Sequence, residues 1–240
     1  MFCRGDAGAY PHIDQTVVIL KTDNTGLIRV ELIGRTMDFM TLDAIPPDEI
    51  YVLDTETTGL FGAPKDVVVD VGITKVSLRH ETVEDVFSSV LGYDVDEWDD
   101  YKRNAWIFQN TDMTLDMVAG APPAINVIED VRRILRNKAV TSYNVAYDMN
   151  KFLYLEPWCL RGTFKPCTDI MVAATEVCKL PSEYYERKYR YPKLDYAYSK
   201  ILDGEDPAGI NGVQDHRALS DARMASYIMI KMFKDGSYRP

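Results

Sequence analysis

The order of strand-like and helix-like segments is the feature of this sequence that most constrains its fold. Runs with the composition of strands come first, and helical periodicity dominates after them. We predict strands over 50–54, 66–76, 83–91 and 139–143, and helices over 124–137, 145–155, 169–180, 193–202 and 217–233. Consecutive strands followed by alternating helices favour an α/β fold, with a mixed β-sheet flanked by helices. The intervening segment 92–123 is expected to form surface structure.

The N-terminal part of the chain carries a different pattern. Two β-prone runs between residues 15 and 34 flank the turn-rich sequence Asp23-Asn24-Thr25-Gly26, which predicts a β-hairpin. Pro46-Pro47 separates this hairpin from the rest of the chain. We therefore predict an N-terminal extension over residues 1–48 and a main domain over residues 49–240. The hairpin either covers a sheet edge of the main domain or contacts a partner or the substrate.

Composition and charge narrow the classes of function. The 240 residues are 46% hydrophobic, which is ample for a buried core. A net charge of −10 argues against a protein that coats nucleic acid through bulk electrostatics, but an enzyme could still hold a short strand end through metal ions. The sequence contains neither a secretory signal nor a run of about 20 apolar residues that could cross a membrane. We expect a cytoplasmic protein with no membrane partner.

Two carboxylates stand at the end of the apolar run Ile50-Tyr51-Val52-Leu53. Because side chains alternate along a strand, Asp54 and Glu56 point the same way and share one site. Neighbouring carboxylates raise each other's pKa and weaken the fold, unless a divalent cation lies between them. An ordinary solvated turn at the end of a strand is the alternative for this sequence taken alone.

Two further acidic residues fall on the apolar faces of predicted helices. Asp148 lies on the apolar side of a helix that Asn144 can cap, and Asp221 lies on the inward face of the last helix. For Asp148 taken alone, the alternative is a first-turn aspartate that the helix dipole favours. Burying a bare carboxylate is costly, so two such placements beside the Asp54 and Glu56 pair favour four acidic groups that converge on metal.

His216 stands at or just before the start of the last predicted helix, a little more than one turn before Asp221. A histidine can gain or lose a proton near neutral pH. A single histidine at a helix end is commonly a plain surface residue. At the rim of the predicted metal site, however, this one suits a general base that activates water.

Three motifs that contain these residues resemble those of the DEDDh exonucleases, typified by the epsilon proofreading subunit of bacterial replicative polymerases. They are Asp54-Thr55-Glu56-Thr57-Thr58-Gly59-Leu60, Ser142-Tyr143-Asn144-Val145-Ala146-Tyr147-Asp148 and His216-Arg217-Ala218-Leu219-Ser220-Asp221-Ala222. The resemblance covers about residues 49–233. Arg217 stands where the tyrosine branch of the superfamily has Tyr, which favours the histidine branch.

The resemblance implies a ribonuclease H-like fold, two Mg²⁺ or Mn²⁺ ions, and release of nucleoside 5′-monophosphates from a 3′ end. By this resemblance Asp54, Glu56 and Asp221 hold the first ion. Asp54 also holds the second ion, and Asp148 contributes through ordered water. His216 would deprotonate the attacking water.

The resemblance also implies how the substrate is held. The backbone around Glu56 and Thr57 would grip the terminal nucleotide, with Leu60 against its base and Asn144 near the phosphate. The expected substrates are single-stranded ends, with DNA favoured over RNA because Thr57-Thr58-Gly59-Leu60 is more similar to the proofreading branch. A polymerase or a repair protein is the partner that the resemblance suggests. The alternative is a non-catalytic module of the same fold that binds a strand end or a replication or repair partner.

Overall fold

The computed structural model describes most of the chain. The residues that it describes are 19–22, 28–32, 35–39, 47–183, 188–210 and 214–240. The chain divides into two units, Met1–Pro47 and Asp48–Pro240.

The first unit contains a three-stranded antiparallel sheet. Its strands are β1 (Ile19–Thr22), β2 (Ile28–Leu32) and β3 (Arg35–Phe39), in that order. The antiparallel pair β1 and β2 lies where the hairpin is predicted, and the predicted turn lies outside the described residues. The prediction lacked β3, because Arg-Thr-Met-Asp-Phe has too few apolar residues to indicate a strand.

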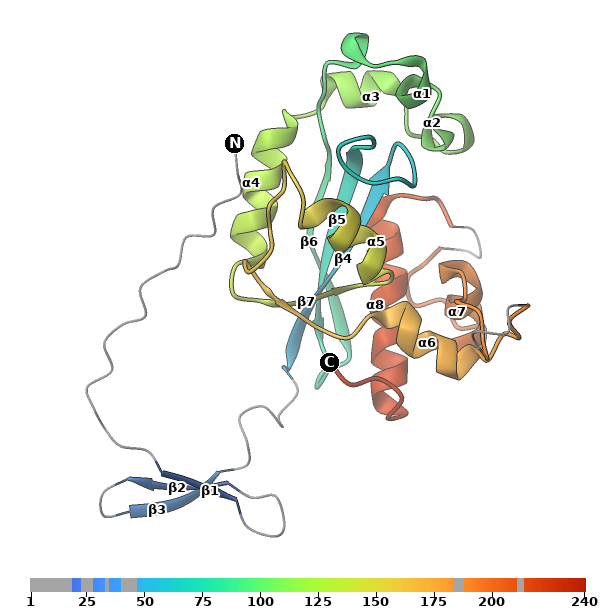
Figure 1. Ribbon diagram of the computed structural model, residues 1–240. Coiled ribbons are helices and arrows are strands. Elements are labelled where there is room, and N and C mark those ends of the chain that lie inside the picture. The colour runs from blue at the N-terminus through green and yellow to red at the C-terminus, as the bar shows by residue number, and fades with distance from the viewer. Residues whose placement is uncertain (1–18, 23–27, 33–34, 40–46, 184–187, 211–213) are drawn as a thin grey trace. The chain divides into compact units, whose positions relative to one another are not determined.

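The second unit is built on a mixed sheet, as predicted (Figure 1), and this sheet has a fifth strand beyond the four that the sequence predicted. The strands are β4 (Glu49–Thr57), β5 (Val68–Ser77), β6 (Thr82–Val90), β7 (Ala139–Ser142) and β8 (Lys165–Pro166), in the order β6-β5-β4-β7-β8. β4, β5 and β6 pair antiparallel, whereas β7 runs parallel to β4 and β8 parallel to β7. A parallel pair needs a crossover connection, which between β4 and β7 includes helix α4 (Ala124–Leu135).

Helices cover both faces of this sheet (Figure 1). Besides α4 they are α5 (Val145–Asp148), the π-helical turn η3 (Met149–Leu153), α6 (Ile170–Cys178), α7 (Leu194–Ile201) and α8 (Ala218–Lys234). Alternate residues of β4 enter two different cores. Ile50 and Val52 pack with residues of α6, α7 and α8, whereas Tyr51 and Leu53 pack with residues of α4 and η3. This alternation decides which way the acidic residues farther along β4 point.

The structure adds detail in two segments that the sequence described only coarsely. The single helix predicted over 145–155 is α5 followed by η3. The segment 92–123, predicted as surface structure, also buries Ala105, Ile107, Met113 and Val118 in a small core that they share with Val69 of β5. It contains η2 (Val95–Glu97), α1 (Asp100–Arg103), α2 (Trp106–Asn110) and α3 (Leu115–Gly120). In the described part of the chain, no helix has the length and apolar character needed to cross a membrane.

Candidate functional site

Strand β4 carries Asp54 and Glu56 to the face that α8 covers. Both continue the row of Ile50 and Val52, and both are partly exposed. The pairing of β4 with β5 shifts register between Glu56 and Thr57, which is an irregularity of the β-bulge kind. Bulges bend a strand and change the direction of its side chains. The strand therefore ends its regular pairing at the acidic pair.

Gly72 on β5 allows α8 to approach the sheet closely. It is the residue directly opposite Asp54 in the pairing of β4 with β5. A Cβ atom at this position would lie 2.2 Å from the backbone nitrogen of Leu219 and 2.4 Å from the carbonyl carbon of Ala218. Only glycine fits such an approach, because real Cβ atoms do not come this near to backbone. The first turn of α8, which contains Asp221, is thus held against the strand that pairs with Asp54.

Three of the predicted residues come together at this place. Ligand atoms of Glu56, His216 and Asp221 all lie within 4.8 Å of one another. The side-chain amide of Gln214 donates a hydrogen bond to Oδ2 of Asp221. Oδ1 of Asp221 is buried and accepts no hydrogen bond from the residues that the structure describes. A buried carboxylate oxygen without a donor suits a cation, and carboxylate oxygens are the ligands that Mg²⁺ and Mn²⁺ prefer.

The carboxylates of this site have raised pKa values. Burial raises the pKa of Glu56 to about 9 and that of Asp221 to about 7, and the charges of neighbouring carboxylates add to both effects. Burial also raises the pKa of Asp54, and the nearby charges of Asp148 and Asp221 raise it further. Shifts of this sign mean that the negative charges lack a counter-charge, which a divalent cation would supply.

Asp148 lies at the end of α5 and is 2% exposed. The hydroxyl of Thr55 donates a hydrogen bond of 2.6 Å to Oδ1 of Asp148. Burial raises the pKa of Asp148 to about 6, and the hydrogen bond from Thr55 opposes that rise. Within the described residues, the close group of ligand atoms includes neither Asp54 nor Asp148. The charge of Asp148 nevertheless raises the pKa values of Asp54 and Glu56.

His216 immediately precedes the N-cap residue of α8. Its backbone has a φ of 53°, in the left-handed region that residues other than glycine adopt uncommonly. The imidazole meets the indole of Trp106 edge to face, with 5.1 Å between the ring centroids. Trp106 begins α2, so the segment between β6 and α4 contributes a side chain to the site.

A groove of about 860 Å³ opens beside these residues. Its lining includes Glu56, His216 and Trp106, together with the three residues predicted to hold the substrate, Thr57, Leu60 and Asn144. As predicted, Asn144 caps α5, because its side-chain oxygen accepts a hydrogen bond from the backbone of Tyr147. Leu60 is 74% exposed at the edge of the groove.

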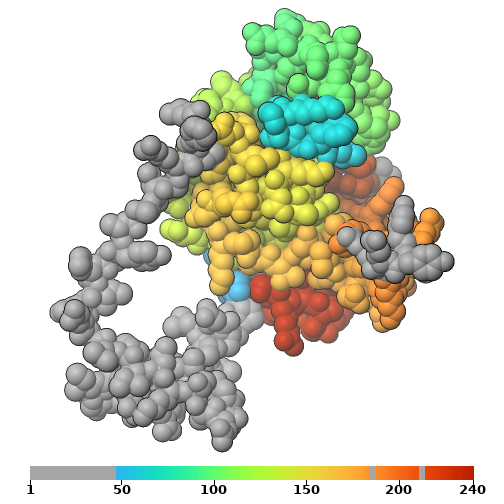
Figure 2. Space-filling model, viewed as in Figure 1, coloured from blue at the N-terminus to red at the C-terminus, as the bar shows by residue number. Residues whose placement is uncertain are grey.

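The segment after β4, which forms one edge of the groove, lies against the segment that contains α1. Figure 2 shows the former in cyan beside the latter in green. Buried Asp66 accepts hydrogen bonds from the backbone of Phe61 and from the hydroxyl of Tyr101. Lys65 lies over the ring of Phe61, with 3.6 Å between Nζ and the centroid. These contacts fix the chain next to Leu60.

Sequence reasoning missed Trp106, Gln214 and Asp70. Asp70 is buried on β5, directly opposite Glu56, and forms an ion pair with Arg217. The sequence indicates a special role for Asp70, because an acidic residue stands within the apolar strand sequence Val67-Val68-Val69-Asp70-Val71. Trp106 had no such signal, because the segment around it lacks periodicity.

Comparisons with known proteins agree with this architecture. A family model described as "Exonuclease", with the family name RNase_T, matches residues 51–229. The chain is 25% identical over 192 residues to the DNA polymerase III PolC-type protein of Bacillus subtilis, and 27% identical over 188 residues to that of Clostridium perfringens. These alignments cover 79% and 78% of this chain but 12% and 11% of those proteins. The chain thus spans about one-eighth of the length of these relatives.

Solved structures share the fold. A full-length 3′-exonuclease matches with a TM-score of 0.57 and 17% identity, over 85% of this chain and 66% of that one. The nuclease domain of 3′hExo, described as a DEDDh family member bound to rAMP, matches with a TM-score of 0.52 and 17% identity. That match covers 80% of this chain and 95% of the other.

Proposed function

Because this chain belongs to the RNase_T exonuclease family, as a DnaQ-like member of the DEDDh type, we propose that it hydrolyses nucleic acids from their 3′ ends and releases nucleoside 5′-monophosphates. One observation carries this proposal. Ligand atoms of Glu56, His216 and Asp221 lie within 4.8 Å of one another beside a groove that is open to solvent. Metal ligands and a general base are therefore available at one place.

The acidic residues have distinct proposed roles. Asp54, Glu56 and Asp221 would hold one Mg²⁺ or Mn²⁺ ion. Asp54 would also hold a second, and Asp148 would contribute through ordered water. When bound, the two ions stabilise the attacking and leaving oxygens of an in-line displacement. The buried Oδ1 of Asp221, which accepts no hydrogen bond from the described residues, supports this assignment.

His216 is the proposed general base. Its neutral imidazole would accept the proton of the attacking water, and its place within the group of ligand atoms puts it within reach of such a water. The edge-to-face contact with Trp106 restricts the rotation of the ring. The base is thus held beside the groove even without substrate.

The groove fits the end of a single strand. Leu60 and Trp106 are 74% and 56% exposed, and both line the groove. Exposed apolar and aromatic side chains bind the faces of nucleobases, which are accessible only where bases are unpaired and unstacked. Thr57 and Leu60 would contact the terminal nucleotide and Asn144 its phosphate. The net charge of −10 limits binding to this local contact. We propose a preference for DNA over RNA because the segment Thr57-Thr58-Gly59-Leu60 is more similar to the proofreading branch.

The relatives suggest the process in which such an activity is used. The PolC-type proteins are named as DNA polymerases, and this chain matches about one-eighth of their length. We propose a role in DNA replication or repair, in which the chain acts on 3′ ends beside a polymerase or a repair protein.

One assay tests the proposed function. The protein is incubated with 5′-labelled single-stranded DNA and RNA of the same sequence, in Mg²⁺, in Mn²⁺ or in EDTA. We expect progressive shortening from the 3′ end in either ion, faster on DNA, with 5′-monophosphates as products and none in EDTA. The variant Asp54→Ala serves as the control for a contaminating nuclease. Binding of the strand without any product would instead identify a non-catalytic module of the same fold.

A further inference from the structure

We propose that Asp70 and Arg217 are positioning residues for His216, because their partly buried ion pair fixes the backbone that carries the general base. This inference rests on the proposed function and adds two residues to the site that the three sequence motifs do not assign. The backbone of His216 is unusual, and contacts of its neighbours must impose this conformation.

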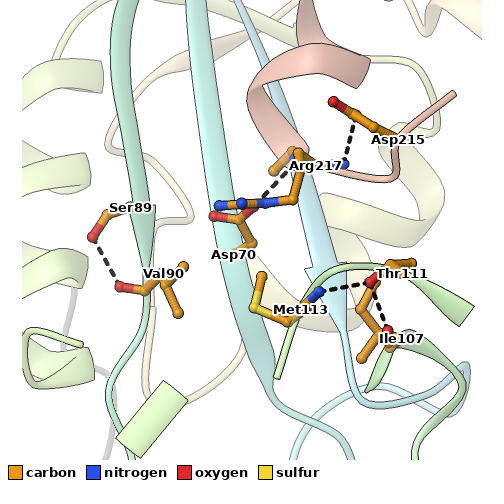
Figure 3. A network of polar contacts seen from close by, with 9 residues as sticks. Asp70, Ser89, Val90, Ile107, Thr111, Met113, Asp215 and Arg217 are labelled. Atoms are coloured by element: carbon orange, nitrogen blue, oxygen red, sulfur yellow. Dashed lines mark hydrogen bonds and ion pairs between the residues drawn. The ribbon is translucent and has the colours of Figure 1, made fainter. Parts of the chain in front are cut away.

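The left-handed backbone of His216 needs support from its neighbours. A φ of 53° is unfavourable for a residue with a Cβ atom, and such conformations persist only where surrounding contacts impose them. Arg217, the next residue, provides two of these contacts. Its backbone N–H donates to Oδ1 of Asp215 at 3.1 Å, and its Nε donates to Oδ2 of Asp70 at 2.8 Å (Figure 3).

Asp70 also binds the start of α8 directly. The backbone N–H of Ala218 donates to Oδ2 of Asp70 at 3.3 Å, so one carboxylate oxygen holds both the side chain of Arg217 and the first turn of the helix. The side chain of Arg217, the N-cap residue of α8, does not make the usual capping hydrogen bond. A strand residue therefore does what a local capping residue does in other helices.

The place of Asp70 argues for a role beyond stability. Its side chain is fully buried on β5, opposite Glu56, and its Oδ1 accepts no hydrogen bond from the described residues. Replacing a buried ion pair by apolar residues is commonly neutral or stabilising, so a need for stability alone does not explain a charge here. The pair does connect the strand partner of Glu56 with the residue after His216. It thus fixes the general base relative to a proposed metal ligand.

Arg217 acts through His216 rather than on the substrate. Within the described part of the chain, the groove is lined by His216 but not by Arg217. The Nε of Arg217 faces Asp70, and about one-third of its side chain is exposed. Loss of this residue should therefore reorient the imidazole and lower kcat, with little change in the KM for a single strand.

The same helix supplies a matched control. Arg223 forms an ion pair with Asp85 on β6, and its Nε donates to Oδ1 at 2.8 Å. This pair also joins α8 to the sheet, but Arg223 lies six residues after Arg217, and among the described residues neither Arg223 nor Asp85 lines the groove. Arg223→Gln therefore removes similar chemistry between α8 and the sheet, without affecting the segment around His216.

The kinetic test compares Arg217→Gln with Arg223→Gln on a single-stranded oligonucleotide, at a temperature where both are folded. We expect kcat to fall about 10- to 100-fold in Arg217→Gln, as misplaced catalytic groups typically cause, and to stay within about twofold in the control. In a His216→Ala background, Arg217→Gln should then lower kcat less than about threefold, because the effects of residues that act as one unit do not add. A full loss in that background would overturn the proposal.

A second measurement does not require activity. The chain has three histidines, so the ring signals of His216 in a proton–carbon NMR spectrum are assigned by their absence in His216→Ala. The ring current of Trp106, 5.1 Å away, makes these signals sensitive to orientation. We expect them to move in Arg217→Gln and in Asp70→Asn but not in Arg223→Gln.

Unchanged His216 signals in Arg217→Gln would refute the positioning role, even if the protein proved not to be a nuclease. Conversely, moved signals in a protein without nuclease activity would leave the positioning contact intact and refute the proposed function. Arg217→Lys keeps the positive charge but loses the planar guanidinium. It provides a milder variant, with a smaller shift of the same signals expected, if Arg217→Gln does not fold.

Discussion

The hydroxyl of Thr55 lies 2.6 Å from the carboxylate of Asp148, to which it donates a hydrogen bond across 93 residues of sequence. Thr55 points to the opposite side of β4 from Asp54 and Glu56. The strand therefore contributes to the site from both of its faces. The bond also has an electrostatic effect, because it stabilises the ionised form of Asp148 against the burial that raises its pKa.

Loss of any one of Asp54, Glu56 and Asp221 should abolish nuclease activity without damaging the fold. Each alanine variant removes a proposed metal ligand and also relieves repulsion between neighbouring carboxylates. If the relief is worth about 1 kcal/mol, the metal-free variant should melt about 2–4 °C above the wild type. Thermal melts in EDTA check this result. Melting well below the wild type in all three variants would show that the carboxylates are structural.

His216→Ala should reduce the rate about 100- to 10,000-fold, the usual effect of losing a general base. The carboxylates remain, so binding of Mn²⁺, measured by calorimetry, should largely survive. In the wild type, activity should fall toward acidic pH, since only the neutral imidazole accepts a proton. Near-normal turnover of the variant at saturating Mg²⁺ would remove His216 from this role.

The metal-free protein should lose stability as the pH rises from about 4 to about 9. Burial raises the pKa of Asp221 to about 7 and of Glu56 to about 9, whereas in the unfolded chain both groups ionise near about pH 4. Between these values the unfolded chain binds fewer protons than the folded one, so the free energy of unfolding falls as the pH rises. Below about pH 4 these two groups therefore cause no loss in the free energy of unfolding.

Melts in EDTA across this pH range measure the effect, and Glu56→Gln should flatten the curve near its upper end. Mg²⁺ should raise the melting temperature more at pH 8 than at pH 6, because metal binding requires ionised ligands. A stability that is constant with pH in EDTA would contradict the raised pKa values.

Trp106→Ala should weaken binding of single strands. Stacking of a nucleobase on an aromatic side chain is typically worth about 1–3 kcal/mol, so KM should rise about fivefold or more. The exposure of Trp106 predicts little change in melting temperature. Ile125→Ala is the control, since Ile125 is 57% exposed on α4 and does not line the groove. Equal KM values for the two variants would exclude Trp106 from substrate binding.

The N-terminal extension is expected to belong to the stable core of the protein. The apolar residues of the predicted hairpin cannot all be exposed to solvent in a stable two-stranded ribbon. A hairpin of this kind more commonly covers a sheet edge of its own chain. A chain that begins at Pro46 should therefore aggregate or melt at a lower temperature. If it is instead monomeric and degrades single strands at the full rate, the extension serves to bind a partner.

The sequence predicted the parts of the site that depend on local periodicity. The alternation of a strand placed Asp54 and Glu56 on one side, and helical spacing predicted the burial of Asp148 and Asp221, which are 2% and 4% exposed. These patterns repeat over a few residues, so they can be read before the fold is known.

The parts that were missed depend on contacts between distant residues. Trp106 belongs to a five-residue helix, which is too short to show a period, and its role depends on its contact with His216. Asp70 meets Arg217 across 147 residues. The π-helical turn after Asp148 likewise depends on how Phe152 and its neighbours pack beneath the sheet.

The close contact at Gly72 has a consequence for how the site responds to temperature. Asp54 on β4 pairs directly with Gly72 on β5, and the first turn of α8, which contains Asp221, packs on that glycine. The contact between β5 and α8 at this point is therefore made by main-chain atoms. Side chains change rotamers on heating, whereas packed backbone shifts very little. The spacing between the backbones of Asp54 and Asp221 is thus set by packed main chain. It should stay nearly constant on heating until the sheet and the helix separate on unfolding.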